Sequence, residues 1–539
     1  MTDPLANASG PGASPVAPHR HLRPDGLAER LAALAERVAI QSGSEPPDAV
    51  NSPLDGTLLG TVPRCGIDDV GRAAAAARIV QEDWSRRAWD ERAEPFLRFH
   101  DLLLERQDEI LDIIQLETAK ARKHAFEEVA DAAIVARHYA HHGEEILAPR
   151  RRKGALPGLT TAWEYRHPKG VVGLIAPWNY PLSLSVSDAI PALLAGNAVL
   201  VKPDRQTPFT ALWAFALLAE AGLPEGLVQM VTGAGSELGP ALVAACDYLS
   251  FTGSTATGRR VARQAGERLI GCSLELGGKN PMLVLPDADL DAAVEGAVRG
   301  AFSNSGQLCI SIERIYVHDE LFRQFTDRFV RRTRGLRLGV SLDYESDMGG
   351  LASADQLAKV DAHVRDAVAE GAEVRCGGRA RPDLAPFYYE PTILTGVTPA
   401  MALYAEETFG PVVSLYPYTS LHDAIEHANA SRYGLNASIW TADIDLAMRV
   451  ATRLECGTVN VNEAYAAAWA SVDSPMGGFK DSGLGRRHGV EGMLKFTEAQ
   501  TVAVQRGLPI GAPPGVADEL FSRAMSQALR VLNRVPGLR

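Results

Sequence analysis

The pattern of apolar and polar positions divides the chain into a helical first part and later parts in which strands and helices alternate. Apolar residues recur at the spacing of an amphipathic helix over residues 27–40, 67–84 and 91–147. From residue 171 the apolar runs become short and are bounded by glycine or proline, as in buried strands. Strands are predicted at residues 171–176, 198–201, 227–231 and 248–251, with helices at 211–221 and 238–245. This alternation predicts a parallel sheet with helices on both faces.

A second alternating part extends from residue 282 to about residue 440. Its predicted strands are at residues 282–285, 314–317 and 412–416, with helices such as 357–370. The pattern therefore predicts an α/β protein with two such units. At roughly 150 residues per domain, a chain of 539 residues has room for both units and for smaller elements.

The two ends of the chain differ from this pattern. Residues 1–26 are rich in proline, glycine, alanine and serine without periodicity, and we interpret them as a mobile tail. Residues 509–539 begin with proline and glycine and continue as an amphipathic helix whose polar side carries arginines. Such a helix could lie on a membrane, but the pattern is more typical of a cap that docks on the rest of the protein.

Composition excludes several classes of protein. Lys and Arg total 54 against 66 Asp and Glu, a net charge of −12, so we expect no nucleic-acid partner. No apolar run approaches the length of a membrane span, and the N-terminus lacks the layout of a secretory signal, so we expect no stable membrane insertion. The six cysteines form no CxxC pairs, which argues against a metal site or a disulfide framework. The expected location is the cytoplasm.

Three segments place polar residues and glycines at the ends of predicted strands. They are Ala176-Pro-Trp-Asn-Tyr-Pro181, Leu274-Glu-Leu-Gly-Gly-Lys-Asn-Pro281 and Asn304-Ser-Gly-Gln-Leu-Cys309. In this order, with Cys309 34 residues after Glu275, they resemble the aldehyde dehydrogenase superfamily over about residues 47–505. Further matching pieces are Val201-Lys-Pro203, Phe251-Thr-Gly-Ser-Thr255, Glu406-Glu-Thr-Phe-Gly-Pro411 and Ser474-Pro-Met-Gly-Gly478.

The resemblance implies the aldehyde dehydrogenase fold, with a Rossmann-like cofactor domain, an α/β catalytic domain and a small β oligomerisation element. We assign residues 27–150 and 169–277 to the cofactor domain and residues 278–484 to the catalytic domain. Residues 151–168 and 485–505 would form the oligomerisation element. The assembly that the resemblance implies is a homodimer or a homotetramer.

Three residues are predicted to be catalytic. Oxidising an aldehyde by hydride transfer requires a tetrahedral carbon that can expel hydride, and addition of a thiolate to the carbonyl makes one. Cys309, close to small and polar residues, is the best-placed nucleophile. The resemblance implies that Asn179 and the Cys309 N–H hold the resulting oxyanion, and that Glu275 activates the water that hydrolyses the thioester. Its position between two leucines should raise the pKa of Glu275 toward the useful range.

The predicted cofactor site does not follow the usual dinucleotide fingerprint. The segment Gly233-Ala-Gly-Ser-Glu-Leu-Gly239 is not GxGxxG, because Leu238 occupies the place of the third glycine. The resemblance implies that the pyrophosphate lies instead at a helix start that includes Gly253 and Ser254. It also assigns four side chains to the cofactor: Trp178, Lys202, Glu407 and Phe409.

One position decides the predicted choice of cofactor. The residue three after Lys202, commonly Glu in members that prefer NAD, is Arg205, and Ala256 stands where a second acid is often found. A 2′-phosphate is attracted by a cation and repelled by a carboxylate, whereas a ribose hydroxyl is best held by a carboxylate. We therefore predict NADP, with NAD as the alternative.

The substrate is predicted less directly. Succinate-semialdehyde dehydrogenases commonly place two arginines in the substrate tunnel, and Ser187 and Ser303 occupy those positions here. The chain nevertheless resembles a divergent bacterial group of NADP-dependent succinate-semialdehyde dehydrogenases, for example through Gly485-Arg-Arg-His-Gly489. Succinate semialdehyde is the predicted substrate, and its carboxylate would need another cation. A broad medium-chain or aromatic aldehyde dehydrogenase is the alternative, because the apolar stretch 465–469 could line the tunnel mouth.

Overall fold

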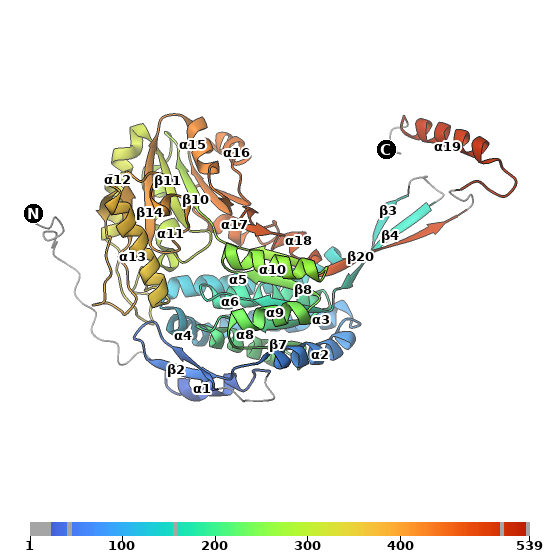
Figure 1. The fold of residues 1–539 in the computed structure, drawn as a ribbon, viewed down its shortest axis with the longest axis horizontal. Coiled ribbons are helices and arrows are strands. Elements are labelled where there is room, and N and C mark those ends of the chain that lie inside the picture. The colour runs from blue at the N-terminus through green and yellow to red at the C-terminus, as the bar shows by residue number, and fades with distance from the viewer. Residues whose placement is uncertain (1–22, 40–45, 155–159, 507–510, 535–539) are drawn as a thin grey trace, which may run out of the picture.

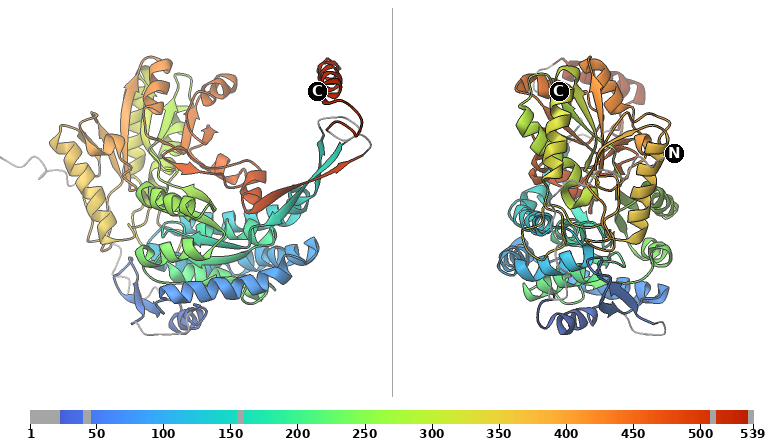
Figure 2. Two further views of the ribbon diagram at one scale, coloured as in Figure 1. Left: turned by 45° about the vertical axis from the view of Figure 1, so that its right-hand side comes forward. Right: turned by 90° about the vertical axis from the view of Figure 1, so that its left-hand side faces the viewer.

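The computed structural model describes residues 23–39, 46–154, 160–506 and 511–534, so nearly all of the predicted N-terminal tail lies outside the described residues. Two α/β units, each built on a large sheet, lie against each other, and a narrow β arm projects from the first (Figures 1 and 2). A final helix lies beyond the far end of this arm. The predicted α/β class is confirmed.

The first unit contains a six-stranded sheet in the order β19-β9-β8-β5-β6-β7, in which β19 is antiparallel to its neighbour and the others are parallel. The strands are β5 (Val171–Ile175), β6 (Ala198–Lys202), β7 (Val228–Met230), β8 (Tyr248–Thr252), β9 (Gly271–Glu275) and β19 (Gly483–Leu484). Around the sheet lie α1 (Leu27–Ala35), α2 (Ile67–Trp84), α3 (Trp89–Glu105), α4 (Gln107–Thr118), α5 (Arg122–Leu147), α6 (Pro181–Val186), α7 (Ala189–Leu194), α8 (Pro208–Glu220), α9 (Gly235–Ala245), α10 (Thr255–Glu267), α18 (Gly489–Leu494) and the hairpin of β1 (Asp48–Asn51) and β2 (Leu58–Val62).

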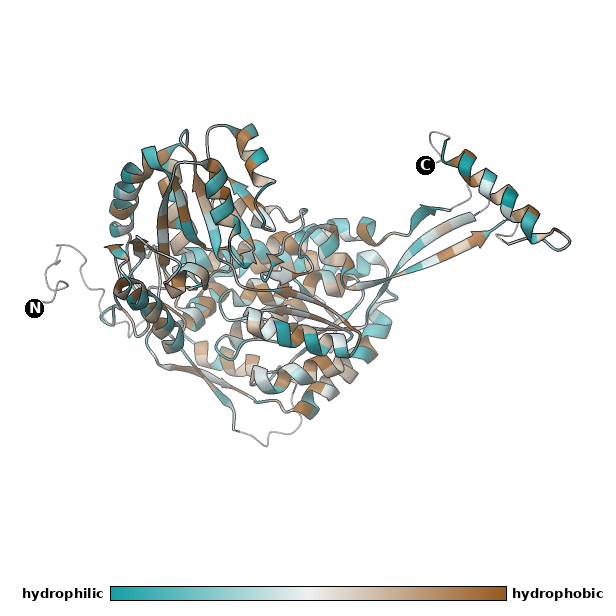
Figure 3. Ribbon diagram, turned by 45° about the horizontal axis from the view of Figure 1, so that its top comes forward, coloured by the Kyte–Doolittle hydropathy of each residue, from teal (hydrophilic) through white to brown (hydrophobic). Residues whose placement is uncertain are grey.

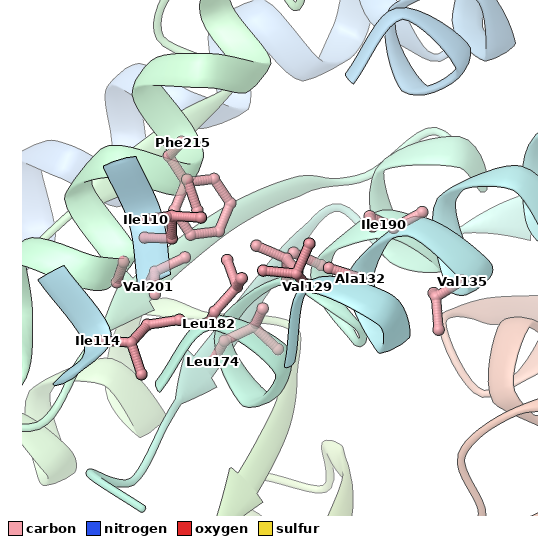
Figure 4. Close-up of a cluster of buried hydrophobic side chains, with 14 of the residues drawn as sticks. Ile110, Ile114, Val129, Ala132, Val135, Leu174, Leu182, Ile190, Val201 and Phe215 are labelled. Carbon is pink, nitrogen blue, oxygen red and sulfur yellow. The ribbon is translucent and has the colours of Figure 1, made fainter. Parts of the chain in front are cut away.

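Burial explains why the central strands are continuous apolar runs. All five residues of β6 are buried, as are four of the five in β5, because helices cover both faces of the sheet. In Figure 4, Leu174 of β5 and Val201 of β6 lie in one cluster with Ile114 of α4, Val129 of α5 and Leu182 of α6. Each of these side chains is at most 2% exposed.

The second unit contains a seven-stranded sheet in the order β12-β13-β14-β11-β10-β16-β17, in which β12 is antiparallel and the others are parallel. The strands are β10 (Asn280–Val284), β11 (Ile312–His318), β12 (Glu373–Cys376), β13 (Thr392–Thr395), β14 (Val412–Tyr418), β16 (Asn436–Trp440) and β17 (Thr458–Val461). The helices are α11 (Leu290–Phe302), α12 (Asp319–Arg334), α13 (Ala354–Ala369), α14 (Ala402–Ala405), α15 (Leu421–Asn429), α16 (Ile444–Ala451), α17 (Ala466–Ala470) and the 3-10 turn η1 (Ser303–Gly306), and two short strands pair as β15 (Tyr433–Gly434) and β18 (Phe479–Lys480).

The arm is an antiparallel sheet in the order β20-β4-β3, made of β3 (Arg150–Lys153), β4 (Thr160–Pro168) and β20 (Thr497–Gln505). It matches the predicted β element only in part. Residues 485–496 contain α18 and lie in the first unit, where α18 packs against α5 and α7. The predicted boundary at residue 485 is therefore too early, since the arm resumes at Thr497.

The predicted C-terminal helix is present as α19 (Asp518–Leu532). None of its residues is buried in this chain, and Leu520 and Leu529 are 64% and 48% exposed. Apolar and polar residues alternate along it in Figure 3, and it stands away from both units. The expected docking on the rest of the protein is thus not found within this chain. None of the described helices combines the length and apolar character needed to cross a membrane.

Candidate active site

The predicted site segments of the first unit follow its strands at one edge of the sheet. Ile175 at the end of β5 pairs with Lys202 of β6 and with Phe251 of β8, and Thr252 pairs with Glu275 of β9. Because these strands are parallel, the residues after them emerge at the same carboxyl edge. β6 and β8 lie on opposite sides of β5, so the strand order reverses between β5 and β8, which is where α/β proteins of this kind commonly bind ligands.

Cys309 lies on a tight loop between α11 and β11. The loop begins with Asn304, Ser305 and Gly306, whose φ angles are 48°, 56° and 69°. Non-glycine residues adopt this left-handed backbone at a cost and only where the surroundings hold them. Here the Ser305 hydroxyl donates to the carbonyl of Gly349 at 2.8 Å. The position of the candidate nucleophile is therefore fixed by contacts from distant parts of the chain.

Two adjacent glycines after β9 let that backbone pass close to the Cys309 loop. A Cβ on Gly278 would lie 2.5 Å from the Cys309 carbonyl oxygen, and a Cβ on Gly277 would lie 2.5 Å from Oε2 of Glu407. The N–H of Gly278 donates to Oε1 of Glu407 at 2.7 Å. Any side chain larger than hydrogen would separate these three segments.

Burial sets the protonation of Glu275 and Cys309. It raises the pKa of Glu275 to about 7, against the lowering effect of Arg487 and Lys495. Burial also raises the pKa of the Cys309 thiol to about 12, to which the charge of Glu275 adds. Oε1 of Glu275 has no hydrogen-bond partner in the described part of the chain. At neutral pH the pair thus consists of a protonated thiol and a carboxyl group that is close to its titration midpoint.

Asn179 lies against the same loop. Its Nδ2 donates to the carbonyl of Gln307 at 3.1 Å, two residues before Cys309. Its own carbonyl accepts from the Lys120 ammonium at 2.6 Å, and Lys120 pairs with Glu128 at 2.5 Å in a fully buried ion pair. The three predicted catalytic residues are therefore brought to one centre, with Lys120 holding the backbone of the asparagine.

Sequence reasoning missed Lys120 and Glu128. Both lie near the break between α4 and α5, where a lysine and a glutamate eight residues apart look like the solvated face of an amphipathic helix. The one local signal is that Lys120 follows Ala119, a non-glycine residue at φ 59°. This is a backbone feature, which the sequence alone does not reveal.

A small pocket of about 50 Å³ opens onto Cys309. Its apolar wall consists of Tyr180, Leu184, Leu308, Ile310, Tyr465, Trp469 and Met476. Its charged or titratable side chains are Glu127, Asp131, Arg487 and His488. The two serines at the expected arginine positions lie close by: Ser187 donates to Asp131 at 2.5 Å, and Ser303 contacts the Tyr465 hydroxyl at 2.9 Å.

The predicted aromatic and acidic cofactor residues do not line the pocket that contains Cys309. The rings of Trp178 and Phe409 meet edge to face with centroids 5.6 Å apart, and both remain partly exposed. The N–H of Phe409 donates to Glu313 at 2.9 Å, and Glu313 forms a buried ion pair with Lys279. This pair fixes the loop that carries Glu407, whose pKa burial raises to about 7.

The predicted phosphate site is the start of α10. Ser254 is its N-cap residue, and its hydroxyl accepts from the N–H of Thr257 at 3.4 Å. Ser254 is exposed and Gly253 is partly exposed, so the first turn of α10 is accessible to a ligand. Lys202 is 4% exposed and donates to the carbonyl of Pro203 at 2.9 Å, and burial lowers its pKa.

Arg205 has a partner that the sequence analysis did not foresee. Its side chain is 52% exposed, and Nη2 donates to Oδ1 of Asp48 at 2.7 Å. Asp48 begins β1, 157 residues earlier, so no local pattern links the two. The attraction of Arg205 for a 2′-phosphate is therefore partly offset by the carboxylate beside it.

The fold and the site have the form of a nucleotide-dependent oxidoreductase, and known proteins identify its family. Residues 40–502 match the model of the aldehyde dehydrogenase family. A protein of Mycolicibacterium smegmatis named "Putative succinate-semialdehyde dehydrogenase [NADP(+)]" is 52% identical over 482 residues, which cover 89% of this chain and 93% of that protein. The chain belongs to the aldehyde dehydrogenase family, and it is an enzyme that oxidises aldehydes.

Comparison with solved structures supports the same family. The crystal structure of an Escherichia coli NADP-dependent enzyme is 33% identical with a TM-score of 0.83, and the match covers 88% of this chain and 99% of that chain. The NAD⁺ complex of an aldehyde dehydrogenase from Bacillus cereus is 33% identical with a TM-score of 0.82, and the match covers 88% and 98%. The predicted aldehyde dehydrogenase fold is confirmed.

Proposed function

We propose that this enzyme oxidises succinate semialdehyde to succinate with NADP. The observation that carries the reaction is a thiol and an amide at one pocket, Cys309 and Asn179, with the carboxyl group of Glu275, whose pKa is raised, close enough for its charge to act on Cys309. The name of the Mycolicibacterium smegmatis relative supports both the substrate and the cofactor.

In the first half of the reaction Cys309 releases its thiol proton to solvent, and the thiolate sulfur adds to the aldehyde carbon. The carbonyl oxygen becomes an oxyanion, for which Nδ2 of Asn179 and the N–H of Cys309 are the proposed donors. When bound, NADP supplies the nicotinamide ring that accepts hydride. Loss of the hydride from the tetrahedral carbon leaves a thioester on Cys309.

In the second half Glu275 removes a proton from water, and the water oxygen attacks the thioester carbon. The carbon–sulfur bond breaks, the acid leaves, and the thiol regains its proton. Two features of Glu275 support this role: its pKa near 7, and an Oε1 atom without a hydrogen-bond partner among the described residues. A carboxyl group of this kind is available to a water molecule at neutral pH.

The residues present fit a nicotinamide dinucleotide. The exposed start of α10 at Ser254 suits a pyrophosphate, and the partly exposed rings of Trp178 and Phe409 suit a flat heteroaromatic ring. Glu407 is the proposed acceptor for ribose hydroxyls. These residues would bind and orient the cofactor beside Cys309.

Lys202 and Arg205 are the proposed contacts for the 2′-phosphate of NADP. A charge-assisted hydrogen bond of this kind contributes about 1.5 to 3 kcal/mol. Asp48 opposes the preference, because its carboxylate already pairs with Arg205 at 2.7 Å. We therefore propose that NADP is preferred, and that the preference increases when Asp48 is neutralised.

The pocket wall supports a second candidate function. Leu184, Leu308, Trp469 and Met476 present an apolar surface toward Cys309, which would also accept medium-chain or aromatic aldehydes. Such an enzyme would use the same catalytic residues. It would differ only in how the substrate tail is held.

We propose a homodimer or homotetramer in which the arm pairs with a second copy of the chain. The exposed strand β20, with Val502 and Val504 at 41% and 44% exposure, supports this assembly. All six cysteines are free, which supports a reducing compartment, and we propose the cytoplasm.

Steady-state kinetics test the proposed function. We expect kcat/KM for succinate semialdehyde to exceed that for butanal and benzaldehyde, and NADP to be preferred to NAD. Arg205→Glu should shift the preference toward NAD, whereas the matched variant Asp48→Asn should shift it further toward NADP. Equal or greater efficiency with benzaldehyde would favour the second candidate, and an NADP/NAD ratio that neither variant changes would contradict the cofactor assignment.

A further inference from the structure

Arg487 is a buried cation at the substrate pocket with unused hydrogen-bonding capacity. It is 6% exposed, and its Nε and Nη2 atoms have no hydrogen-bond acceptor in the described part of the chain. Oδ1 of Asp188 lies 3.4 Å from Nε, but the same oxygen accepts from the ammonium of Lys495 at 3.0 Å. A guanidinium group carries five N–H donors, and burying them without partners is costly. The structure therefore leaves room for a ligand that supplies acceptor atoms.

The acidic groups of the same pocket are already satisfied. Both carboxylate oxygens of Glu127 accept from tyrosine hydroxyls, at 2.8 and 3.1 Å. Oδ2 of Asp131 accepts from Ser187 at 2.5 Å and also from the hydroxyl of Ser183. Nδ1 of His488, by contrast, is buried without a partner, like the two nitrogens of Arg487. Oε1 of Glu275 and Oδ1 of Asn304 are also unpartnered, but among the charged side chains that line the pocket only Arg487 has N–H donors left without an acceptor in the described part of the chain.

We propose that Arg487 binds the carboxylate tail of the semialdehyde substrate. The proposal rests on the proposed function, because it assumes a substrate with a carboxylate. It supplies the cation that the serines at positions 187 and 303 leave unassigned. The planar fork of a guanidinium group matches the two oxygens of a carboxylate, and the same pocket reaches Cys309, where the aldehyde end reacts.

A second arginine near the pocket is a weaker candidate. Arg299 packs on the ring of Tyr465 at 5.2 Å, but it pairs with Glu463 at 3.0 Å and its side chain is 47% exposed. It lines a neighbouring pocket that does not include Cys309. Its charge is therefore satisfied and hydrated, and Arg299 provides a matched control.

Arg487 also acts on the catalytic groups, so the test must separate two roles. Its charge lowers the pKa of Glu275 and of Cys309. Losing that effect would change the rate with every aldehyde alike. Losing a contact to the substrate tail would change the rate only with aldehydes that carry a carboxylate. The ratio of kcat/KM for succinate semialdehyde to that for butanal isolates the contact, because the two substrates have the same chain length.

The experiment measures this ratio for the wild type, Arg487→Met, Arg487→Lys and Arg299→Met. We expect Arg487→Met to lower the ratio about tenfold to a hundredfold, mainly through KM for succinate semialdehyde. Arg487→Lys keeps the charge and should lower it less, and Arg299→Met should keep the wild-type ratio. Succinate should inhibit butanal oxidation competitively in the wild type and more weakly in Arg487→Met.

The outcomes that overturn the proposal are distinct from failure of the proposed function. An unchanged ratio in Arg487→Met, or a loss seen in Arg299→Met instead, would remove Arg487 as the carboxylate contact. If Arg487→Met does not fold, Arg487→Lys provides the test. The proposal would then be overturned if this variant keeps both the wild-type ratio of kcat/KM values and the wild-type inhibition by succinate. A wild type that does not prefer succinate semialdehyde to butanal would contradict the proposed function itself, and with it this inference.

Discussion

Burial raises the pKa of the Glu275 carboxyl group to about 7. Four charged groups act on it: Arg487, Lys495 and Arg486 lower its pKa, and Asp188 raises it. Their combined effect does not cancel the desolvation, so the pKa stays near 7 rather than at its ordinary value of 4.5. The charged form, which is the one that can remove a proton from water, is therefore the minor form below pH 7.

This protonation predicts the pH dependence of the enzyme. We expect kcat, where deacylation limits it, to rise as pH increases from about 6 to about 8, and to fall about tenfold per unit well below the pKa. Stopped-flow or steady-state rates across this range measure the profile. A rate that is constant between pH 5.5 and 8 would show that no group with this pKa limits turnover.

Lys120 and Glu128 form a fully buried ion pair beside Asn179. Replacing Lys120 by Met leaves the carboxylate of Glu128 without its cation, and breaking a buried pair in this way costs about 3 to 5 kcal/mol. Chemical denaturation measures the free energy of unfolding. The matched variant Lys123→Met removes a lysine that is 43% exposed, and we expect it to change stability by at most about 1 kcal/mol. Equal effects of the two substitutions would contradict this account of Lys120.

At the scale of elements, the pattern of the sequence predicts what local physics determines. Helix α2 matches its predicted range of residues 67–84, because apolar residues at helical spacing bury one face. Strand β6 is also predicted closely, because it is buried on both faces. The loop before Cys309 is different, because its sequence does not predict that Asn304, Ser305 and Gly306 all adopt the left-handed backbone conformation. That backbone is imposed by contacts that only the folded chain provides.

Long-range pairing limits the prediction of the site in the same way. The motifs locate Asn179, Glu275 and Cys309, because each lies at the end of a strand or on a glycine-bounded loop. They do not reveal that Asp48 meets Arg205, or that Arg487 reaches the substrate pocket. In both cases the chemistry depends on residues brought together by topology rather than by spacing.

Gly306 tests the rigidity of the nucleophile loop. It has φ 69°, and a Cβ at this position would lie 2.0 Å from the carbonyl oxygen of Gly410. We expect Gly306→Ala to displace Cys309 and to lower kcat by about a hundredfold, since small displacements of a reacting group have effects of this size. The control is Gly266→Ala in α10, where nothing lies within 4 Å of the added Cβ. Wild-type kcat in Gly306→Ala would show that the loop adapts.

At the scale of the whole molecule, the chain returns to the first sheet after building the second unit. β19 pairs with β9 so that Gly483 lies opposite Glu275. The segment that carries Arg487 follows directly, and the arm then leads to α19 (Figure 1). The last part of the chain thus contributes first to the active site and then to a region outside both units.

The exposure of α19 predicts a role in assembly. Because none of its residues is buried in this chain, deleting residues 514–539 should leave each subunit folded and active but should weaken the oligomer. Analytical ultracentrifugation over a range of concentrations measures the change. The arginines of α19 do not carry enough positive charge for firm attachment to lipid. If the deletion leaves the assembly unchanged but abolishes co-sedimentation of the enzyme with anionic vesicles, the helix binds membranes instead.

The central claim is that Cys309 carries a thioester that Glu275 hydrolyses, and the Glu275→Gln variant tests it most directly. Rapid mixing of this variant with cofactor and aldehyde should give a burst of reduced cofactor equal to the enzyme concentration, followed by a slow steady state. Intact-protein mass spectrometry should then detect an acyl group that is absent from Cys309→Ala, which should be inactive. Slow linear progress without a burst, or a Cys309→Ala variant with even a tenth of the wild-type rate, would contradict the account.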